Sequence, residues 1–230
     1  MAKVELQIAH ILKPLLKENT PSPSGIYNIL KRHNLNRLTP KMQQTKRKII
    51  KEKAGELGHI DCHYLKTQII KGNKQKLYLV SLIDDCSRVA HGEVVTDLKS
   101  ITVMFATLRI INIMNDVYKI KFQEIMADNG PEFGPSQSQR KETHPFERML
   151  VELGIKRRYM RPYRPQTNGK IERFWRTLNE DMLVDAEYES VDKLKIELAE
   201  YLGYYNNSRP HQGIEGRTPI QQLELVEKCA

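Results

Sequence analysis

Regular strand patterns begin at Leu57-Gly58-His59-Ile60-Asp61-Cys62-His63-Tyr64-Leu65, and this stretch decides the fold. It reads as a strand with the acid Asp61 near its end. Similar patterns predict four more strands, at 76–83, 89–96, 122–127 and 155–159. The polar run Asp84-Asp85-Cys86-Ser87 predicts a hairpin turn between the second and third strands.

Helical spacing predicts helices between and after these strands. They are expected at 100–118, at 146–153, at 168–184 and at 191–205. Ser100 is the predicted N-cap of the first, and Gly154 ends the second. Three strands, a helix, a strand, a helix, a strand and then helices is an α/β order. It implies a mixed five-stranded sheet flanked by helices.

Three carboxylates in this pattern suggest one two-metal site for phosphoryl transfer. Asp61 lies on the first strand, and Glu172 lies near the start of a predicted helix. Asp128 opens Asp128-Asn129-Gly130-Pro131-Glu132-Phe133, directly after an apolar strand. Two carboxylate-bound ions can stabilise the attacking and leaving oxygens of a displacement at phosphorus. Hard oxygen ligands favour Mg²⁺ or Mn²⁺.

Simpler roles stay open for each acid. Asp128 could serve an Asx turn, and Glu172 could serve only the helix dipole. Strand alternation places His59, Asp61 and His63 on one face, so a His-Asp-His metal site is also conceivable. Other acids between Asp128 and Glu172 are alternative third ligands, namely Glu132, Glu147 and Glu152.

The surroundings of Glu172 are strongly basic, which suggests DNA phosphates around it. Within residues 156–176 Glu172 is the only acid, and the basic residues are Lys156, Arg157, Arg158, Arg161, Arg164, Lys170, Arg173 and Arg176. If Asn168 is the N-cap, the helix start at Gln166, Thr167 and Gly169 offers N–H groups to a phosphate. The pair Phe174-Trp175 is expected to pack in the core, with base stacking as the alternative.

The net charge of +9 sits entirely at the N-terminus. Residues 1–53 hold 12 basic and 3 acidic residues, whereas residues 54–230 hold 25 of each. Helical patterns at 3–17 and from about 24, with Ser24 as N-cap, predict two short helices that resemble half of a helix-turn-helix. The second would present Tyr27, Asn28, Lys31 and Arg32 to DNA. An ordinary helical hairpin or a solvated basic tail is the alternative.

The polar stretch that follows is expected to be a linker that tracks phosphates, with Lys46, Arg47 and Lys48 among its contacts. No apolar run of membrane-spanning length and no signal-peptide pattern is present. Three cysteines with unremarkable spacing fit a reduced, cytoplasmic protein. We therefore expect a location in the cytoplasm at the nucleoid, with no membrane partner.

In order along the chain, the motifs His-x-Asp, Asp-Asn-Gly-x-Glu-Phe and Pro-Gln-Thr-Asn-Gly-Lys-x-Glu-Arg-Phe resemble those of bacterial insertion-sequence transposases with a retroviral-integrase catalytic core. The run Tyr205-Asn206-Asn207-Ser208-Arg209-Pro210-His211-Gln212-Gly213 is similar to the C-terminal signature of that group. The resemblance implies a ribonuclease-H-like fold and a metal-dependent (DDE-type) polynucleotidyl transferase. It makes Asp61, Asp128 and Glu172 the catalytic, metal-binding acids.

The expected function is cleavage at the ends of a mobile element and transfer of the 3′-OH into target DNA. Two Mg²⁺ or Mn²⁺ ions, double-stranded DNA at the element ends and the target, and a homo-oligomeric synaptic complex would take part. DNA contacts are expected from Arg161, Arg164, Gln166, Thr167, Lys170, Arg173 and Arg176 as well as the N-terminal residues. A nuclease of the same fold without joining activity, and a domesticated regulator without catalysis, are the alternatives.

Four parts are expected along the chain. They are a partial helix-turn-helix at 1–38, a basic linker at 39–55, the catalytic core at 56–185, and a C-terminal helix with a docking tail at 186–230. Because the chain begins so close to the half helix-turn-helix, a fragment of a longer transposase, or a chain that works with an upstream domain, is also consistent with the sequence.

Overall fold

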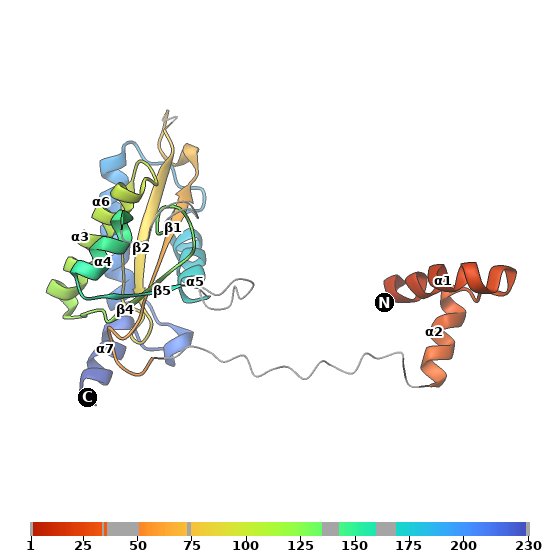
Figure 1. Ribbon diagram of the computed structural model, residues 1–230. Coiled ribbons are helices and arrows are strands. Elements are labelled where there is room, and N and C mark those ends of the chain that lie inside the picture. Colours follow the sequence, from red (N-terminus) through yellow and green to blue (C-terminus); the bar gives the residue numbers. More distant parts are fainter. Residues whose placement is uncertain are drawn as a thin grey trace. The chain divides into compact units, whose positions relative to one another are not determined.

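The computed structural model describes residues 2–33, 35, 51–72, 75–134, 143–159 and 169–228 (Figure 1). The chain forms two compact units, Met1–Arg47 and Lys48–Ala230. The finer division into four parts stays a prediction. None of the helices within the described ranges has the length and apolar character needed to cross a membrane.

The N-terminal unit contains the two predicted helices, α1 (Ala2–Leu16) and α2 (Pro23–Arg32), joined by the short turn η1 (Lys17–Asn19). The N-cap of α2 is Ser22 and not Ser24, since the Ser22 hydroxyl accepts a hydrogen bond from the Gly25 N–H at 3.1 Å. The physical reason is Pro23, whose fixed φ suits the first helical position and starts the helix earlier.

The second unit is built on the predicted mixed five-stranded sheet, in the order β3-β2-β1-β4-β5. The strands are β1 (Gly58–Leu65), β2 (Leu77–Asp84), β3 (Ala90–Val95), β4 (Glu124–Ala127) and β5 (Lys156–Tyr159). β1, β2 and β3 pair antiparallel, whereas β4 runs parallel to both β1 and β5. Asp61 lies in the middle of β1 rather than near its end, because β2 pairs with the strand as far as Leu65.

Helices cover both faces of the sheet, as predicted (Figure 1). Their bounds are α3 (Ser100–Tyr118), α4 (Pro145–Glu152), α5 (Gly169–Leu178), α6 (Val191–Asn207) and α7 (Pro219–Lys228). One core contains α3 and α4 with side chains such as Ile60 and Leu82. The other core contains α5 and α6 with Leu79 and Ile83. The strand period of two thus sorts each strand between the two layers.

Three details differ from the sequence prediction. Ser100 is not the N-cap of α3; the N-cap is Lys99, with no side-chain cap, and its N–H bonds to the Asp97 carboxylate instead. The predicted helix 168–184 continues after α5 as one π-helical turn, η5 (Asn179–Leu183). α7 was not predicted, although Thr218, which accepts from the Gln221 N–H, is an ordinary start signal before Pro219.

Candidate active site

Asp61 faces the layer that contains α5. Strand alternation places Ile60 and Cys62 in or against the α3–α4 core, so Asp61 points to the opposite face. Its Oδ1 accepts a hydrogen bond from the Cys62 N–H, and its Oδ2 accepts one from Trp175 Nε1, both at 2.9 Å. A half-buried carboxylate on the central strand is therefore oriented by two donors.

Trp175 fixes α5 above this carboxylate. The indole ring stacks on the His63 imidazole, with ring centroids 5.0 Å apart and planes inclined by 19°. Phe174 and Trp175 are both buried, which confirms that the pair packs in the core. The sequence did not predict the contact with Asp61, which joins residues 114 positions apart.

Asp128 follows the last residue of β4, next to β1. Gly58 pairs with Ile125 and His59 with Met126. Extending this parallel register by two residues places Asp128 beside Asp61. The predicted Asx turn is present, because Asp128 Oδ1 accepts from the Gly130 N–H at 2.9 Å. The other carboxylate oxygen is not used in this turn and points to a ligand role.

Negative charge accumulates here. Burial raises the pKa of Asp61 from 3.8 to about 6, and the charges of Asp128 and Glu132 raise it further against the lowering effect of its two hydrogen bonds. Burial and the Asp128 charge also raise the pKa of Glu132. Burial and then the charges of Glu132, Asp61 and Asp128 raise the pKa of the Cys62 thiol. A divalent cation would relieve this repulsion, and hard carboxylate oxygens fit Mg²⁺ or Mn²⁺.

Glu172 is exposed on the first turn of α5, three residues before Trp175. No group of three His, Cys, Asp or Glu side chains placed to hold one metal ion occurs among the residues that the structure describes. The electrostatics thus associate Asp61 with Asp128 and Glu132, while Glu172 stays a predicted third ligand. The same finding gives no support to a His-Asp-His metal site.

The other two alternative acids have structural partners. Glu147 forms a buried ion pair with Arg157 at 2.9 Å, the two side chains being 10% and 4% exposed. It also accepts from the Tyr159 hydroxyl at 2.7 Å. Glu152 is exposed and pairs with Arg148 one helical turn away. Arg157 in turn donates to the main-chain carbonyl of Asp128 at 2.9 Å, so the Glu147 pair supports the site from behind.

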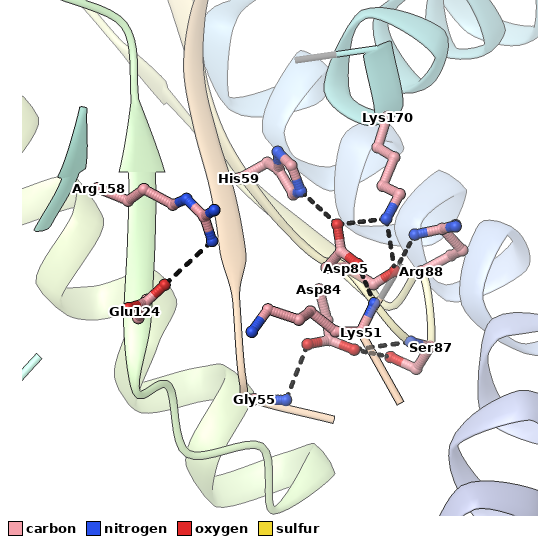
Figure 2. A network of polar contacts seen from close by, with 10 residues as sticks. All are labelled: Lys51, Gly55, His59, Asp84, Asp85, Ser87, Arg88, Glu124, Arg158 and Lys170. Atoms are coloured by element: carbon pink, nitrogen blue, oxygen red, sulfur yellow. Dashed lines mark hydrogen bonds and ion pairs between the residues drawn. The ribbon is translucent and has the colours of Figure 1, made fainter. Parts of the chain in front are cut away.

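Asp84 and Asp85 form the predicted hairpin turn but do more than that (Figure 2). Asp84 is fully buried and accepts hydrogen bonds from the Gly55 N–H at 2.8 Å and from the Ser87 N–H and hydroxyl at 2.7 Å. Asp85 accepts from His59 Nε2 at 2.6 Å and forms an ion pair with Lys170.

The Asp85 contacts link three elements: the β2–β3 turn, β1 and α5 (Figure 2). Burial raises the pKa of Asp85, but the hydrogen bonds from His59 and Lys170 outweigh it and hold the pKa at about 2. Asp85 is therefore a permanent anion at neutral pH. Since Lys170 stands two residues before Glu172, this ion pair fixes the start of the helix that carries Glu172.

The predicted DNA-binding residues fall into three groups. Several lie outside the described residues, namely Lys46, Arg47, Lys48, Arg161, Arg164, Gln166 and Thr167, as does the predicted N-cap Asn168. On α2 the side chains of Asn28, Lys31 and Arg32 are exposed and Tyr27 is half-buried. On α5 Arg173 and Arg176 are exposed, whereas Lys170 is held by Asp85.

Part of the basic segment around Glu172 is neutralised within the fold. Lys156 and Arg158 pair with Glu124 at 3.2 Å each, and Arg157 pairs with Glu147. Figure 2 shows the Arg158–Glu124 pair between β5 and β4. The sequence count of eight basic residues therefore overstates the charge that this segment can offer to DNA, because their acidic partners lie far along the chain.

Comparison with known proteins agrees with this fold and site. Residues 153–219 match the family model described as the integrase core domain. The ORF3 protein of Spiroplasma virus SpV1-C74, named as an integrase, is 25% identical over 193 residues, covering 81% of this chain and 53% of that protein. InsK of Escherichia coli, named as a transposase of insertion sequence IS150, is 26% identical over 149 residues, 65% of this chain and 49% of that protein. The chain thus spans about half the length of these relatives.

Solved structures with the same fold are retroviral integrase cores. The catalytic core of BIV integrase has a TM-score of 0.53 at 21% identity and covers 76% of this chain and 97% of that one. The HTLV-2 integrase core in complex with magnesium has a TM-score of 0.52 at 20% identity, with 74% and 97% covered. The fold and site define a ribonuclease-H-like core of the integrase class. Within that class the chain is a relative of integrases and of insertion-sequence transposases.

Proposed function

We propose that this chain is the catalytic part of a DNA transposase or integrase. The observation that carries the proposal is the pair Asp61 and Asp128 on adjacent parallel strands, where their mutual charge and burial raise the pKa of Asp61 to about 6. Within an integrase-type sheet, such a pair is suited to hold catalytic cations. The raised pKa marks a functional site rather than a structural ion pair.

The proposed reaction has two displacements at phosphorus. Water attacks a phosphodiester at the element end, which breaks the P–O3′ bond and leaves a free 3′-OH on the element. That 3′-OH then attacks a target phosphodiester, forming one P–O bond and releasing the 3′-OH of the target strand. Neither step needs a covalent bond between protein and DNA.

The protein's part is to position the reactants and to hold charge. Asp61 would be shared by two divalent ions, with Asp128 and Glu172 holding one each. When bound, the ions supply Lewis-acid stabilisation of the attacking and leaving oxygens. Trp175 and the Cys62 N–H keep the Asp61 carboxylate in one orientation.

Metal binding can be tested apart from activity, because Trp175 is the only tryptophan of the chain and touches Asp61. Paramagnetic Mn²⁺ bound by Asp61 is expected to quench its fluorescence. Asp61→Asn and Asp128→Asn should abolish the saturable quenching, and Glu152→Gln is the matched control. Quenching that survives in both aspartate variants would reject this metal site.

Strand-transfer assays on end-mimicking oligonucleotides test the function itself. Asp61→Asn, Asp128→Asn and Glu172→Gln should each abolish cleavage and joining while DNA binding persists. Activity of Glu172→Gln equal to wild type, together with loss in Glu132→Gln, would move the third ligand to Glu132. Cleavage without joining by the wild-type chain would favour a nuclease, and DNA binding without either would favour a regulator.

Partners and location follow from the same proposal. The proposed DNA contacts are α2 with Tyr27, Asn28, Lys31 and Arg32, the basic linker, and the exposed Arg173 and Arg176. Joining two element ends calls for at least two copies of the chain. A protein that acts on chromosomal DNA in this way would work at the nucleoid.

A further inference from the structure

A basic pocket lies on the flank of α5 that faces away from the carboxylates. The pocket has a volume of about 520 Å³, and α5, the β2–β3 turn and the segment 209–213 form its walls. Lys170, Arg173 and Thr177 recur on α5 at spacings of three and four, so they share one flank. Glu172 and Trp175, also three residues apart, lie on the other.

Cationic side chains dominate this basic pocket. It is lined by Arg88, Lys170, Arg173, Arg176, Arg209 and His211, with Glu180 as the acid among its described lining residues. Asp85 compensates Lys170, and Asp181 pairs with Arg209 at 2.7 Å. Arg88, Arg173 and Arg176 form no ion pair with a carboxylate in the described part of the chain. The pocket therefore has an excess of positive charge.

The walls are fixed before any ligand arrives. Tyr205 is buried with its ring edge-on to Phe174 at 5.1 Å and to His211 at 4.5 Å. The main chain of His211 exchanges hydrogen bonds with Arg217 and Gly216 at 3.0 and 2.9 Å. Arg88 donates to the main-chain carbonyl of Asp85, which holds its guanidinium at the turn (Figure 2). Preformed donors lose less conformational entropy when they bind a ligand.

The pKa shifts within the basic pocket agree with its geometry. Burial lowers the pKa of His211, and the charges of Arg209, Arg88 and Arg173 lower it further, against the raising effect of its hydrogen bond to the Tyr205 carbonyl. Burial and then the Arg88 charge lower the pKa of Lys170, against the opposing effect of Asp85. An anion among these side chains would offset the repulsion that the shifts report.

We propose that this pocket binds a backbone phosphate of a DNA strand that crosses α5, with Arg88, Arg173 and Arg209 as its main contacts. The proposal rests on the proposed function and adds a DNA subsite outside the carboxylate site. Arg176 supports a crossing strand, because it lines both this pocket and a second pocket of about 630 Å³ at Trp175 and His63. A phosphate held here would set the position of the strand relative to the acids on the opposite flank.

Salt-dependent DNA binding by the full chain tests the assignment. Arg173→Gln and the double variant Arg88→Gln/Arg173→Gln are compared with Arg148→Gln, an exposed arginine on α4 of the other layer. Each phosphate that is no longer neutralised should lower the slope of log affinity against log salt by about 0.9 on duplex DNA. We expect a shallower slope for the pocket variants and an unchanged slope for the control. Wild-type slopes in both pocket variants would overturn the proposal.

Two further arms separate the remaining outcomes. Arg173 is exposed and contacts only Gln212 among its described partners, so its variant should keep the wild-type melting temperature and report on binding alone. If inorganic phosphate stabilises the wild type but not the pocket variants while their DNA slopes stay equal, the pocket takes a free anion and the DNA assignment is wrong. If the slopes change as expected but the wild type performs no strand transfer, the pocket assignment stands and the proposed function is rejected.

Discussion

Trp175 Nε1 donates a hydrogen bond to Asp61 Oδ2 at 2.9 Å, which joins the helix of the predicted third acid to the central strand. The indole thus acts as an outer partner that orients a metal-binding carboxylate. The same ring stacks on His63, so three side chains from two elements form one unit. A change in the indole is therefore expected to reach the metal through Asp61.

Trp175→Phe should weaken metal binding without removing the site. The phenyl ring can still stack on His63, but Asp61 loses its N–H donor. Loss of such an outer partner typically costs 10–100-fold in metal affinity or activity. The measurement is the Mg²⁺ concentration for half-maximal strand transfer. In an Asp61→Asn background the substitution should have no further effect on the metal requirement, and an added loss there would show that Trp175 acts elsewhere.

Asp85→Asn should reduce stability in a pH-dependent way. The pKa of Asp85 is about 2 in the fold, below the 3.8 of a free carboxyl, so its stabilising contribution is present above about pH 4 and is lost as the pH falls toward 2. A shift of this size corresponds to about 2 kcal/mol at neutral pH. Urea unfolding of both proteins from pH 7 to pH 2.5 measures the difference. A difference that does not shrink at low pH would mean that the ionised form is not what stabilises the turn.

Glu147→Gln should destabilise the fold, whereas Glu132→Gln should not. Removing the charge of Glu147 leaves Arg157 buried without a counter-ion, which costs about 3–5 kcal/mol when a buried pair is broken. Neutralising Glu132 instead removes repulsion from Asp61 and Asp128. Thermal melting without metal compares the two variants. Equal melting temperatures would contradict the structural role given to Glu147.

Strand transfer should proceed with Mg²⁺ or Mn²⁺ and hardly at all with Ca²⁺. Three carboxylates give a compact oxygen site, whereas Ca²⁺ takes longer bonds and a higher coordination number. Parallel assays in each ion, with EDTA as the blank, provide the measurement. Efficient joining in Ca²⁺, or joining that survives EDTA, is incompatible with the two-metal proposal.

Removal of residues 1–53 should strip most of the affinity for terminal DNA and leave a folded core. The deleted stretch contains the whole net charge of +9, and most of it, Met1–Arg47, is a separate compact unit. The slope of log affinity against log salt should fall by about 0.9 for each phosphate that the shortened chain no longer neutralises. Binding isotherms on terminal and scrambled duplexes test this. Equal slopes for the full and shortened chains would make the N-terminus a solvated tail.

Local patterns in the sequence were enough to predict the strands, most helices and the mixed sheet, because the periods of two and 3.6 reflect which face each residue buries. They also singled out Asp61 and Asp128, since an acid in or directly after a buried strand is unusual. Helix ends were less predictable. Ser22 rather than Ser24 caps α2, and Asp97 rather than Ser100 accepts the N–H bond near the start of α3, because neighbouring turn geometry chooses among nearby polar residues.

The tertiary structure alone decided which charges are already paired. Lys170, which the sequence assigned to DNA, is held by Asp85, and Asp61 meets Trp175 across 114 positions of the chain. The excess charge of the basic pocket likewise depends on Arg88 and Arg209 meeting beside α5. Such pairs depend on the strand order β3-β2-β1-β4-β5 and on the layer that each helix joins. Local periodicity determines which way a side chain faces, but only the packed fold determines what it meets there.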